Sequence, residues 1–259
     1  MPFAEVDGAR FYYGFDGPEG APVLLFCNSL GTDHTMWDPQ VPVFARTLRV
    51  LRYDRRGHGA SAVTPGPYTI ERLGRDIVGL LDALKIDRVR FCGLSLGGMT
   101  GMWLGAHAAS RIDKLVLCNT AAQIGPPEPW NARIEAVRNG GLAAIEPAVM
   151  GRWFTPKFLA QPTPMFGRMR EVFLGLSPEG YVACCAAVRD QDQRESIRRI
   201  TAPTLVVAGT HDASTTPAAG RFMADRIAGA RYVELDAAHI SNVEAAGPFT
   251  AAVLDFLAD

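Results

Sequence analysis

The stretch Arg-Val-Arg-Phe-Cys-Gly-Leu-Ser-Leu-Gly-Gly-Met, residues 88–99, decides how the rest of the chain is interpreted. Its first half is a β-branched and apolar run, which breaks into the pattern Gly-x-Ser-x-Gly at residues 93–97. This pattern is typical of a nucleophile elbow, a sharp turn from a strand into a helix with a strained serine at its tip. Glycine is needed at Gly93 and Gly97 because larger side chains would collide. The pattern therefore predicts Ser95 as an exposed nucleophile at the N-terminus of a helix.

The surrounding sequence supplies the strand and the helix that an elbow needs. A short apolar run ending at Cys92 precedes the motif, and an uncharged segment rich in Gly, Ala, Met and Trp, Met99–Ala109, follows as a predicted buried helix. The alternative is a glycine-rich turn that packs against a strand, with Ser95 only filling space. The strand-turn-helix context favours the elbow.

Composition excludes some classes of partner. The 259 residues include 26 basic and 27 acidic side chains, for a net charge of −1. Such a chain has no overall basic field for nucleic acid or for an anionic membrane. It is long enough to bury a sizeable core, in one large domain or two small ones.

The cysteines and the N-terminus predict a cytoplasmic protein. Five cysteines are an odd number, and three of them end apolar runs, so we interpret them as core residues in a reducing compartment. No pair has the spacing of a zinc or redox site, so no metal is predicted. Residues 1–10 lack the apolar region of a secretory signal, and polar residues interrupt the uncharged stretch 91–110, so no membrane span is predicted.

Continuous apolar runs recur along the chain and predict a mostly parallel sheet. Runs without alternation are typical of strands buried on both faces. A hairpin is predicted within residues 3–14, around Asp7-Gly8, and an amphipathic helix over residues 69–84. The predicted parallel strands are Val23–Cys27, Val50–Tyr53, Val89–Cys92, Leu115–Cys118, Leu205–Ala208 and Tyr232–Leu235.

The strand-helix rhythm fails once, between Asn119 and Ile200. This segment has no strand-like run and is helical and punctuated by proline. Because a structureless loop of this length is improbable, we interpret it as a helical lid over a binding site. The predicted division is a core domain of residues 1–119 and 201–259 with a helical cap of residues 120–200.

A serine nucleophile needs a base, and the base needs a carboxylate that holds its tautomer. In sheets that carry such an elbow, the partners follow in the order Ser, Asp or Glu, His, on loops after later strands. His239, after the Tyr232–Leu235 run, is the one of five histidines with the right order and loop. Asp212, after the Leu205–Ala208 run, is the predicted acid, and Asp236 is the alternative.

Two backbone N–H groups are predicted to form an oxyanion hole. The elbow aims the N–H of Leu96 at the developing negative charge, and the helix dipole adds to it. The second donor is expected in the loop Asn28-Ser-Leu-Gly31, where we predict the N–H of Leu30. The motif Asp-Arg-Arg-Gly-His-Gly-Ala-Ser at residues 54–61 is interpreted as turn architecture without chemistry.

These motifs resemble those of α/β-hydrolases, and the resemblance extends over nearly the whole chain. The resemblance implies an α/β-hydrolase fold: a mostly parallel sheet flanked by helices, with an inserted helical cap. More narrowly, the chain resembles the 3-oxoadipate enol-lactonases of the β-ketoadipate pathway of aromatic catabolism. The stretches that carry this narrower resemblance are Asn28-Ser-Leu-Gly-Thr-Asp33, Trp37-Asp, Trp130-Asn-Ala-Arg133 and Arg152-Trp-Phe-Thr-Pro156.

The narrower resemblance implies a carboxylic ester hydrolase that opens a small lactone bearing a free carboxylate, without cofactor or metal. Such a substrate favours a cationic group beside aromatic walls in the cap. Arg133 is the first candidate for that cation and Arg152 the second, and Trp130 and Trp153 are candidate walls or packing anchors. The alternatives are another carboxylesterase, a C–C bond hydrolase or a perhydrolase with the same triad, or a ligand receptor on this fold that does not turn over.

Overall fold

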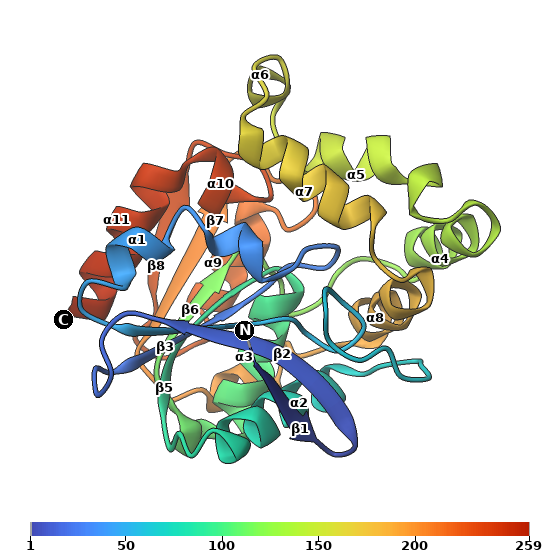
Figure 1. Cartoon of the computed structure of the whole chain (residues 1–259). Helices are drawn as coiled ribbons and strands as arrows, with labels where there is room; N and C mark the ends of the chain where they lie inside the picture. Colours follow the sequence, from blue (N-terminus) through green and yellow to red (C-terminus); the bar gives the residue numbers. More distant parts are fainter. Residues whose placement is uncertain (1, 259) are drawn as a thin grey trace.

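Apolar runs that lack alternation form the strands of one central sheet, as the sequence predicted. The computed structural model describes residues 2–258, and within them the sheet has eight strands in the order β1-β2-β4-β3-β5-β6-β7-β8 (Figure 1). The strands are β1 Phe3–Val6, β2 Ala9–Asp16, β3 Val23–Cys27, β4 Arg49–Tyr53, β5 Val89–Leu94, β6 Ile112–Cys118, β7 Thr204–Gly209 and β8 Arg231–Leu235.

The sheet is parallel except at its N-terminal edge. Strands β1 and β2 pair antiparallel as a hairpin, and β2 pairs antiparallel with β4. The pairs β3–β4, β3–β5, β5–β6, β6–β7 and β7–β8 are all parallel. The carboxyl ends of the parallel strands therefore share one edge, where α/β sheets place their ligands. The predicted mostly parallel sheet is confirmed.

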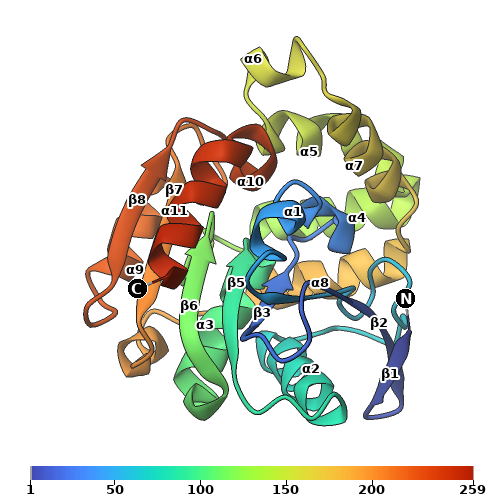
Figure 2. The ribbon, with the colours of Figure 1, turned by 60° about the vertical axis from the view of Figure 1, so that its left-hand side comes forward.

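Helices cover both faces of the sheet. Helices α1 and α11 lie on one face, and α2, α3 and α9 lie on the other (Figures 1 and 2). Short 3₁₀ turns lie at residues 34–37, 109–111, 142–144 and 196–199. The α-helices are α1 Val41–Phe44, α2 Ile70–Ala83, α3 Leu96–His107, α4 Glu128–Gly140, α5 Glu146–Trp153, α6 Pro156–Leu159, α7 Pro164–Leu174, α8 Pro178–Asp190, α9 Pro217–Ala224, α10 Ser241–Glu244 and α11 Ala246–Ala258.

Helix α2 shows how local sequence sets an element. Thr69 precedes it with extended backbone, and its hydroxyl accepts a hydrogen bond from the Arg72 N–H, which caps the first turn. Leu73, Ile77 and Leu80 recur at helical spacing and are buried against the core. The observed bounds match the predicted helix over residues 69–84 to within one residue at each end.

The chain between β6 and β7 is where the strand-helix alternation is interrupted. Helices α4 to α8 follow one another there and lie over the carboxyl ends of the parallel strands (Figure 2). Hydrogen bonds join this segment to the chain after β8: the Ile240 N–H donates to the Trp153 carbonyl at 3.0 Å, and the Thr155 N–H donates to Oε1 of Glu244, the last residue of α10, at 3.1 Å. The division into a core domain and a cap of residues 120–200 remains our proposal.

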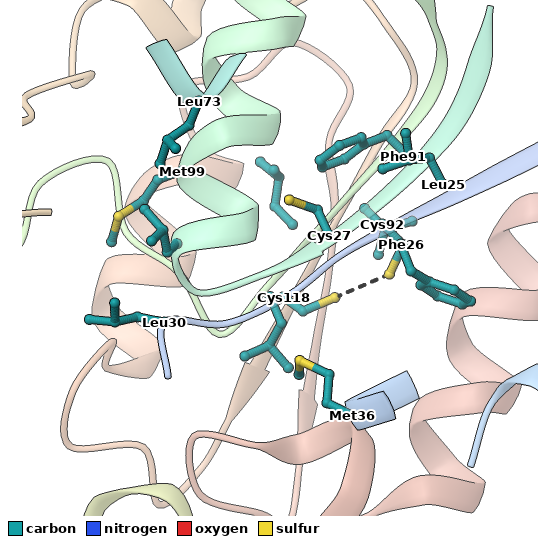
Figure 3. Close-up of a cluster of buried hydrophobic side chains, with 14 of the residues drawn as sticks. Leu25, Phe26, Cys27, Leu30, Met36, Leu73, Phe91, Cys92, Met99 and Cys118 are labelled. Carbon is teal, nitrogen blue, oxygen red and sulfur yellow. Dashed lines mark hydrogen bonds between the residues drawn. The ribbon is translucent and has the colours of Figure 1, made fainter. Parts of the chain in front are cut away.

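Small sulfur-containing side chains fill the sheet interior beneath the elbow. Figure 3 shows Cys27, Cys92 and Cys118 among the buried apolar groups, with the Sγ atoms of Cys92 and Cys118 separated by 3.8 Å. All five cysteines are free thiols and buried. Burial raises the pKa of the Cys92 thiol well above its usual value, so this side chain packs as a neutral group.

None of the single helices within residues 2–258 has both the length and the apolar character needed to cross a membrane. One bent pair, α7 with α8, meets those two criteria only when the helices are taken together.

Candidate active site

Ser95 lies at the tip of a strained strand-to-helix turn. It falls between the end of β5 and the start of α3, and its φ of 59° is in the left-handed region that non-glycine residues rarely adopt. Its N–H donates to the Cys118 carbonyl at 2.9 Å, and its own carbonyl accepts from the Thr120 hydroxyl at 2.8 Å. Neighbouring structure thus holds the serine in a conformation that costs about 1–3 kcal/mol.

The predicted exposure of Ser95 is wrong. The residue is only 8% exposed, since residues between β6 and β7, among them Trp130 and Trp153, line the cavity around it. The motif alone cannot predict this burial, because the residues that cover Ser95 lie far from it in the sequence.

The glycines around Ser95 are required by close backbone approach. A Cβ atom at Gly97 would lie 2.1 Å from the Cys27 carbonyl oxygen, and one at Gly93 would lie 2.4 Å from the Gly97 carbonyl oxygen. Both obstacles are backbone atoms, which cannot move aside as a flexible side chain can. The elbow is therefore packed directly against the end of β3.

We expect Gly97→Ala to destabilise the protein by about 3 kcal/mol, because the new methyl group overlaps the backbone of β3. Gly167→Ala is the matched control, since Gly167 also lies inside a helix but a Cβ there would have no atom within 4 Å. That control should be neutral or stabilising by about 0.5–1 kcal/mol. Urea unfolding of the two variants measures the difference, and equal stabilities would contradict this account of the elbow.

A histidine and an aspartate meet beside the elbow. His239 follows β8 and Asp212 follows β7, and His239 Nδ1 lies 2.8 Å from Asp212 Oδ2. Residue His239 is 5% exposed and residue Asp212 is 2% exposed. Because Nδ1 is bonded to the carboxylate, Nε2 is left for a base.

Four hydrogen bonds besides that to His239 hold the Asp212 carboxylate. Oδ1 accepts from the N–H groups of Ser214 and Thr215 at 2.8 and 2.9 Å, and Oδ2 accepts from the Thr215 hydroxyl at 2.6 Å and from Asn119 Nδ2 at 3.0 Å. Burial opposes ionisation of this carboxyl, but His239 and Thr215 outweigh it and hold its pKa below the usual value. Asp212 is therefore a fixed anion that orients His239.

The alternative acid lies elsewhere. Asp236 is exposed and pairs with His211, whose Nε2 lies 2.8 Å from Asp236 Oδ1. The competing histidines His34 and His107 are also engaged, with Asp54 and with Arg199. The geometry favours the Asp212–His239 pair, while the catalytic roles of Ser95, Asp212 and His239 remain predictions.

The two predicted oxyanion donors come from segments that touch. Leu96 is the first residue of α3, so its N–H has no acceptor within the helix. Leu30 lies in the loop after β3, against which Gly97 packs. Within residues 2–258, neither N–H has a hydrogen-bond partner. Both are thus available to a ligand.

A cavity of about 250 Å³ lies between the loops of the core and the helices between β6 and β7, and residues of both line it. It brings together six of the eight predicted site residues, and Arg152 lines it too. Asp212 lies behind His239, and Leu96 is fully buried below Ser95. The predicted residues in the lining are Leu30, Ser95, Trp130, Arg133, Trp153 and His239.

Two guanidinium groups give this cavity a positive charge. Arg133 lies over the Trp130 ring at 4.6 Å from its centroid, and Arg152 is close enough that, after burial, the charge of Arg133 lowers its pKa. Among the described residues, neither arginine has a carboxylate within 4 Å. Unpaired cations beside aromatic rings fit an anionic ligand.

Trp153 serves both of the roles that the sequence left open. It lines the cavity, and its ring also packs edge-on against Phe173 with centroids 5.7 Å apart. It is 5% exposed, so most of its surface is packing contact.

Sequence reasoning missed two residues of the site. Tyr181 of α8 lines the cavity, where its hydroxyl interacts with Arg133, and burial raises the pKa of this phenol above its usual value, so it is neutral. No sequence signal marks it. Thr215, which bonds Asp212, lies three residues after that acid, so an Asx-turn pattern could have suggested it.

No cluster of three or more His, Cys, Asp or Glu side chains that could hold a metal ion lies within residues 2–258. The polar groups that line the cavity include Ser95, His239 and two arginines, and a serine beside a histidine with free backbone N–H groups meets the requirements for acyl transfer.

Comparison with known proteins places this geometry in a family. A model of the Alpha/beta hydrolase family matches residues 24–252. The chain belongs to the α/β-hydrolases. The nucleophile-elbow position of Ser95 and the order of Asp212 and His239 follow the pattern of that fold.

Similar α/β-hydrolases include named enol-lactonases. The chain is 42% identical to 3-oxoadipate enol-lactonase 2 of Acinetobacter baylyi over 93% of this chain and 90% of that protein. It is 41% identical to 3-oxoadipate enol-lactonase 1 of the same organism, over 88% and 86% of the two chains. The crystal structure of the enol-lactonase from Burkholderia xenovorans is 49% identical and superposes with a TM-score of 0.98 over the whole of both chains. The resemblance found in the sequence motifs is confirmed.

Proposed function

We propose that this chain is a 3-oxoadipate enol-lactonase, a carboxylic ester hydrolase of the β-ketoadipate pathway. The observation that carries the proposal is the pair of arginines that have no carboxylate partner among the described residues, in the cavity that also holds Ser95 and His239. A lactone with a free carboxylate presents an ester carbonyl to the serine and an anion to the arginines. The identities of 41–49% to enol-lactonases support the same substrate.

In the proposed acylation step, His239 takes the proton of the Ser95 hydroxyl while Asp212 holds the imidazole in place. Ser95 Oγ then bonds to the lactone carbonyl carbon, and the N–H groups of Leu30 and Leu96 stabilise the oxyanion. Collapse of the tetrahedral intermediate breaks the ring C–O bond. The leaving oxygen receives the proton from His239 and remains attached to the acyl chain as an enol.

The enol character of the leaving group favours ring opening. Tautomerisation of the enol to a ketone removes the group that could reclose the ring. His239 next takes a proton from water, which attacks the acyl-enzyme and restores Ser95 as the second carboxylate is released. The product is the open-chain diacid 3-oxoadipate, and no step of this sequence calls for a cofactor or metal.

The proposal is tested by following hydrolysis of 3-oxoadipate enol-lactone in the ultraviolet, beside a simple aryl ester. We expect rapid loss of the lactone, much faster than cleavage of the ester. Cleavage of the ester alone would replace the lactonase with another carboxylesterase. Saturable binding of the lactone without turnover would favour a receptor.

Arg133→Gln is expected to raise KM for the lactone about 10- to 100-fold with little change in kcat, since it removes a charge-assisted bond to the substrate carboxylate. A neutral aryl acetate, which has no carboxylate, should be cleaved as before. Arg138→Gln, in the same helix but on its exposed side, is the control and should leave both substrates unaffected. If KM for the lactone stayed constant in Arg133→Gln, the carboxylate site would lie elsewhere, with Arg152 as the next candidate.

We also propose a cytoplasmic location, where five free thiols remain reduced.

A further inference from the structure

The segment Asp54–Ser61, which the sequence predicted to be turn architecture alone, contacts the loop that carries Leu30 at three points. Arg55 Nη2 donates to the Asn28 carbonyl. The Gly31 N–H donates to His58 Nε2 at 3.0 Å, and the His34 N–H donates to Asp54 Oδ1 at 2.8 Å. One contact falls before the proposed oxyanion donor Leu30, at Asn28, and two fall after it, at Gly31 and His34.

Two of these contacts fix the peptide groups on either side of that donor. The Leu30 N–H belongs to the peptide between residues 29 and 30. Arg55 holds the preceding peptide by its carbonyl oxygen at Asn28, and His58 holds the following peptide by its N–H at Gly31. Because each peptide group is planar, holding the groups on both sides limits the rotation of the peptide between them and so restrains the direction of the Leu30 N–H.

The protonation state of His58 is set by its surroundings. A backbone N–H can only donate, so Nε2 of His58 must accept and its proton must be on Nδ1. The ring is 1% exposed, and burial together with the charge of Arg55 lowers the pKa of His58 to about 3. The imidazole is therefore neutral at neutral pH, and its Nε2 atom can accept the hydrogen bond of the Gly31 N–H.

The Gly31 backbone needs such a partner. Its φ of +87° is left-handed, and a Cβ there would lie 3.0 Å from the Phe173 ring and 3.2 Å from Trp153. Glycine is the residue that fits this position, but it is also the most flexible one. A buried acceptor restrains the flexibility that glycine brings to the oxyanion loop.

We propose that His58 is a positioning residue, which holds the Leu30 N–H in the oxyanion hole by accepting the hydrogen bond of the Gly31 N–H. It acts through the loop and does not touch the substrate, since it does not line the cavity. The inference rests on the proposed hydrolase function, but it applies to any ester that Ser95 attacks.

The test compares three substitutions. His58→Leu keeps an apolar side chain of similar size but removes the acceptor, whereas the amide oxygen of His58→Gln can replace Nε2. Arg56→Gln is the matched control, because Arg56 lies in the same buried segment but pairs with Asp76, at 2.7 Å between Nε and Oδ2, and not with the loop. Arg72 continues to bond Asp76 in that control at 2.9 Å, so the carboxylate is not left alone.

We expect His58→Leu to lower kcat about 100-fold, the size of a lost oxyanion donor, on both the enol-lactone and an aryl acetate. In a Ser95→Ala background, the Kd of the lactone measured by calorimetry should not change, because ground-state binding does not use the oxyanion hole. His58→Gln should recover most of kcat. Arg56→Gln should lower the melting temperature but leave kcat unchanged.

The proposal is overturned if His58→Leu keeps kcat within threefold of the parent, if His58→Gln loses as much as His58→Leu, or if Arg56→Gln loses as much again. His58→Asn, whose amide is too short to reach Gly31, replaces the leucine variant should that one not fold, with the same expected loss. If the parent cleaves the aryl acetate but not the lactone, the lactonase function fails, while the ester data still decide the role of His58.

Discussion

Replacement of Ser95 by alanine is expected to lower kcat for ester and lactone hydrolysis by about 10⁵-fold or more. The substitution removes the proposed nucleophile, and residues of a triad act as a unit, so the loss is as large as that of the whole triad. Since alanine fits the same backbone, the melting temperature should change little. The measurement is steady-state hydrolysis of the lactone with enzyme freed of wild-type contamination.

Ser110→Ala is the control for this experiment, because Ser110 is an exposed serine in the 3₁₀ turn that follows α3, away from the cavity. It should retain full activity. If Ser95→Ala kept more than about a hundredth of the parent rate, water rather than Ser95 would be the attacking group, and the covalent mechanism would be wrong.

Asp212→Asn is expected to lower kcat by about 10⁴-fold with the fold intact. An asparagine can turn an N–H toward Nδ1 of His239, which then adopts the tautomer with its proton on Nε2 and cannot accept the serine proton. The two hydrogen bonds that Oδ1 of Asp212 accepts, from the N–H groups of Ser214 and Thr215, can still be made by the remaining amide oxygen. The loss should therefore appear in kcat with only a small change in stability.

The matched control is Asp236→Asn, since Asp236 is the acid that the chain order left as an alternative. It is exposed and pairs with His211 at the surface, so its substitution should change kcat less than twofold. The reverse pattern, with activity lost in Asp236→Asn and kept in Asp212→Asn, would assign the triad acid to Asp236. Comparable losses in both variants would mean that neither aspartate alone orients His239.

The arrangement of Arg133 and Arg152 gives the cavity an electrostatic preference. Two guanidinium groups near one another without carboxylate partners repel, and the pKa of Arg152 is lowered by burial and by this repulsion. An anion bound between them relieves the repulsion and gains charge-assisted hydrogen bonds. The same cavity disfavours cationic esters, so selection between substrates need not involve the catalytic groups.

Local sequence predicts the elements of this protein well because each is set by neighbours in the chain. The run Val23–Cys27 is β3 as predicted, and Thr69 begins α2 because its side chain caps that helix. The Gly-x-Ser-x-Gly pattern places Ser95 at a strained turn because only glycine tolerates the approach of Cys27 and Gly97 backbone. In these cases a short stretch of sequence is enough to predict the element, because it contains the capping residue or the glycines that the element needs.

The proposed triad could be assigned from chain order for a related reason. Parallel strands bring their carboxyl ends to one edge, so the loops after β5, β7 and β8 meet whatever the details of packing. Ser95, Asp212 and His239 each follow one of these strands. Topology alone thus places their loops together, although the 2.8 Å contact between His239 and Asp212 is a property of the folded chain.

By itself, then, the sequence determined the parallel sheet, the elbow and the loops on which a nucleophile, base and acid could meet. Only the tertiary structure decided which side chains of α4, α5 and α8 enclose Ser95, that Tyr181 is among them, and that His58 holds the loop of Leu30. The reason is that periodicity and turn chemistry act over a few residues along the chain. The cavity and the oxyanion loop depend on contacts between segments far apart in sequence, whose relative placement is fixed only when the core packs.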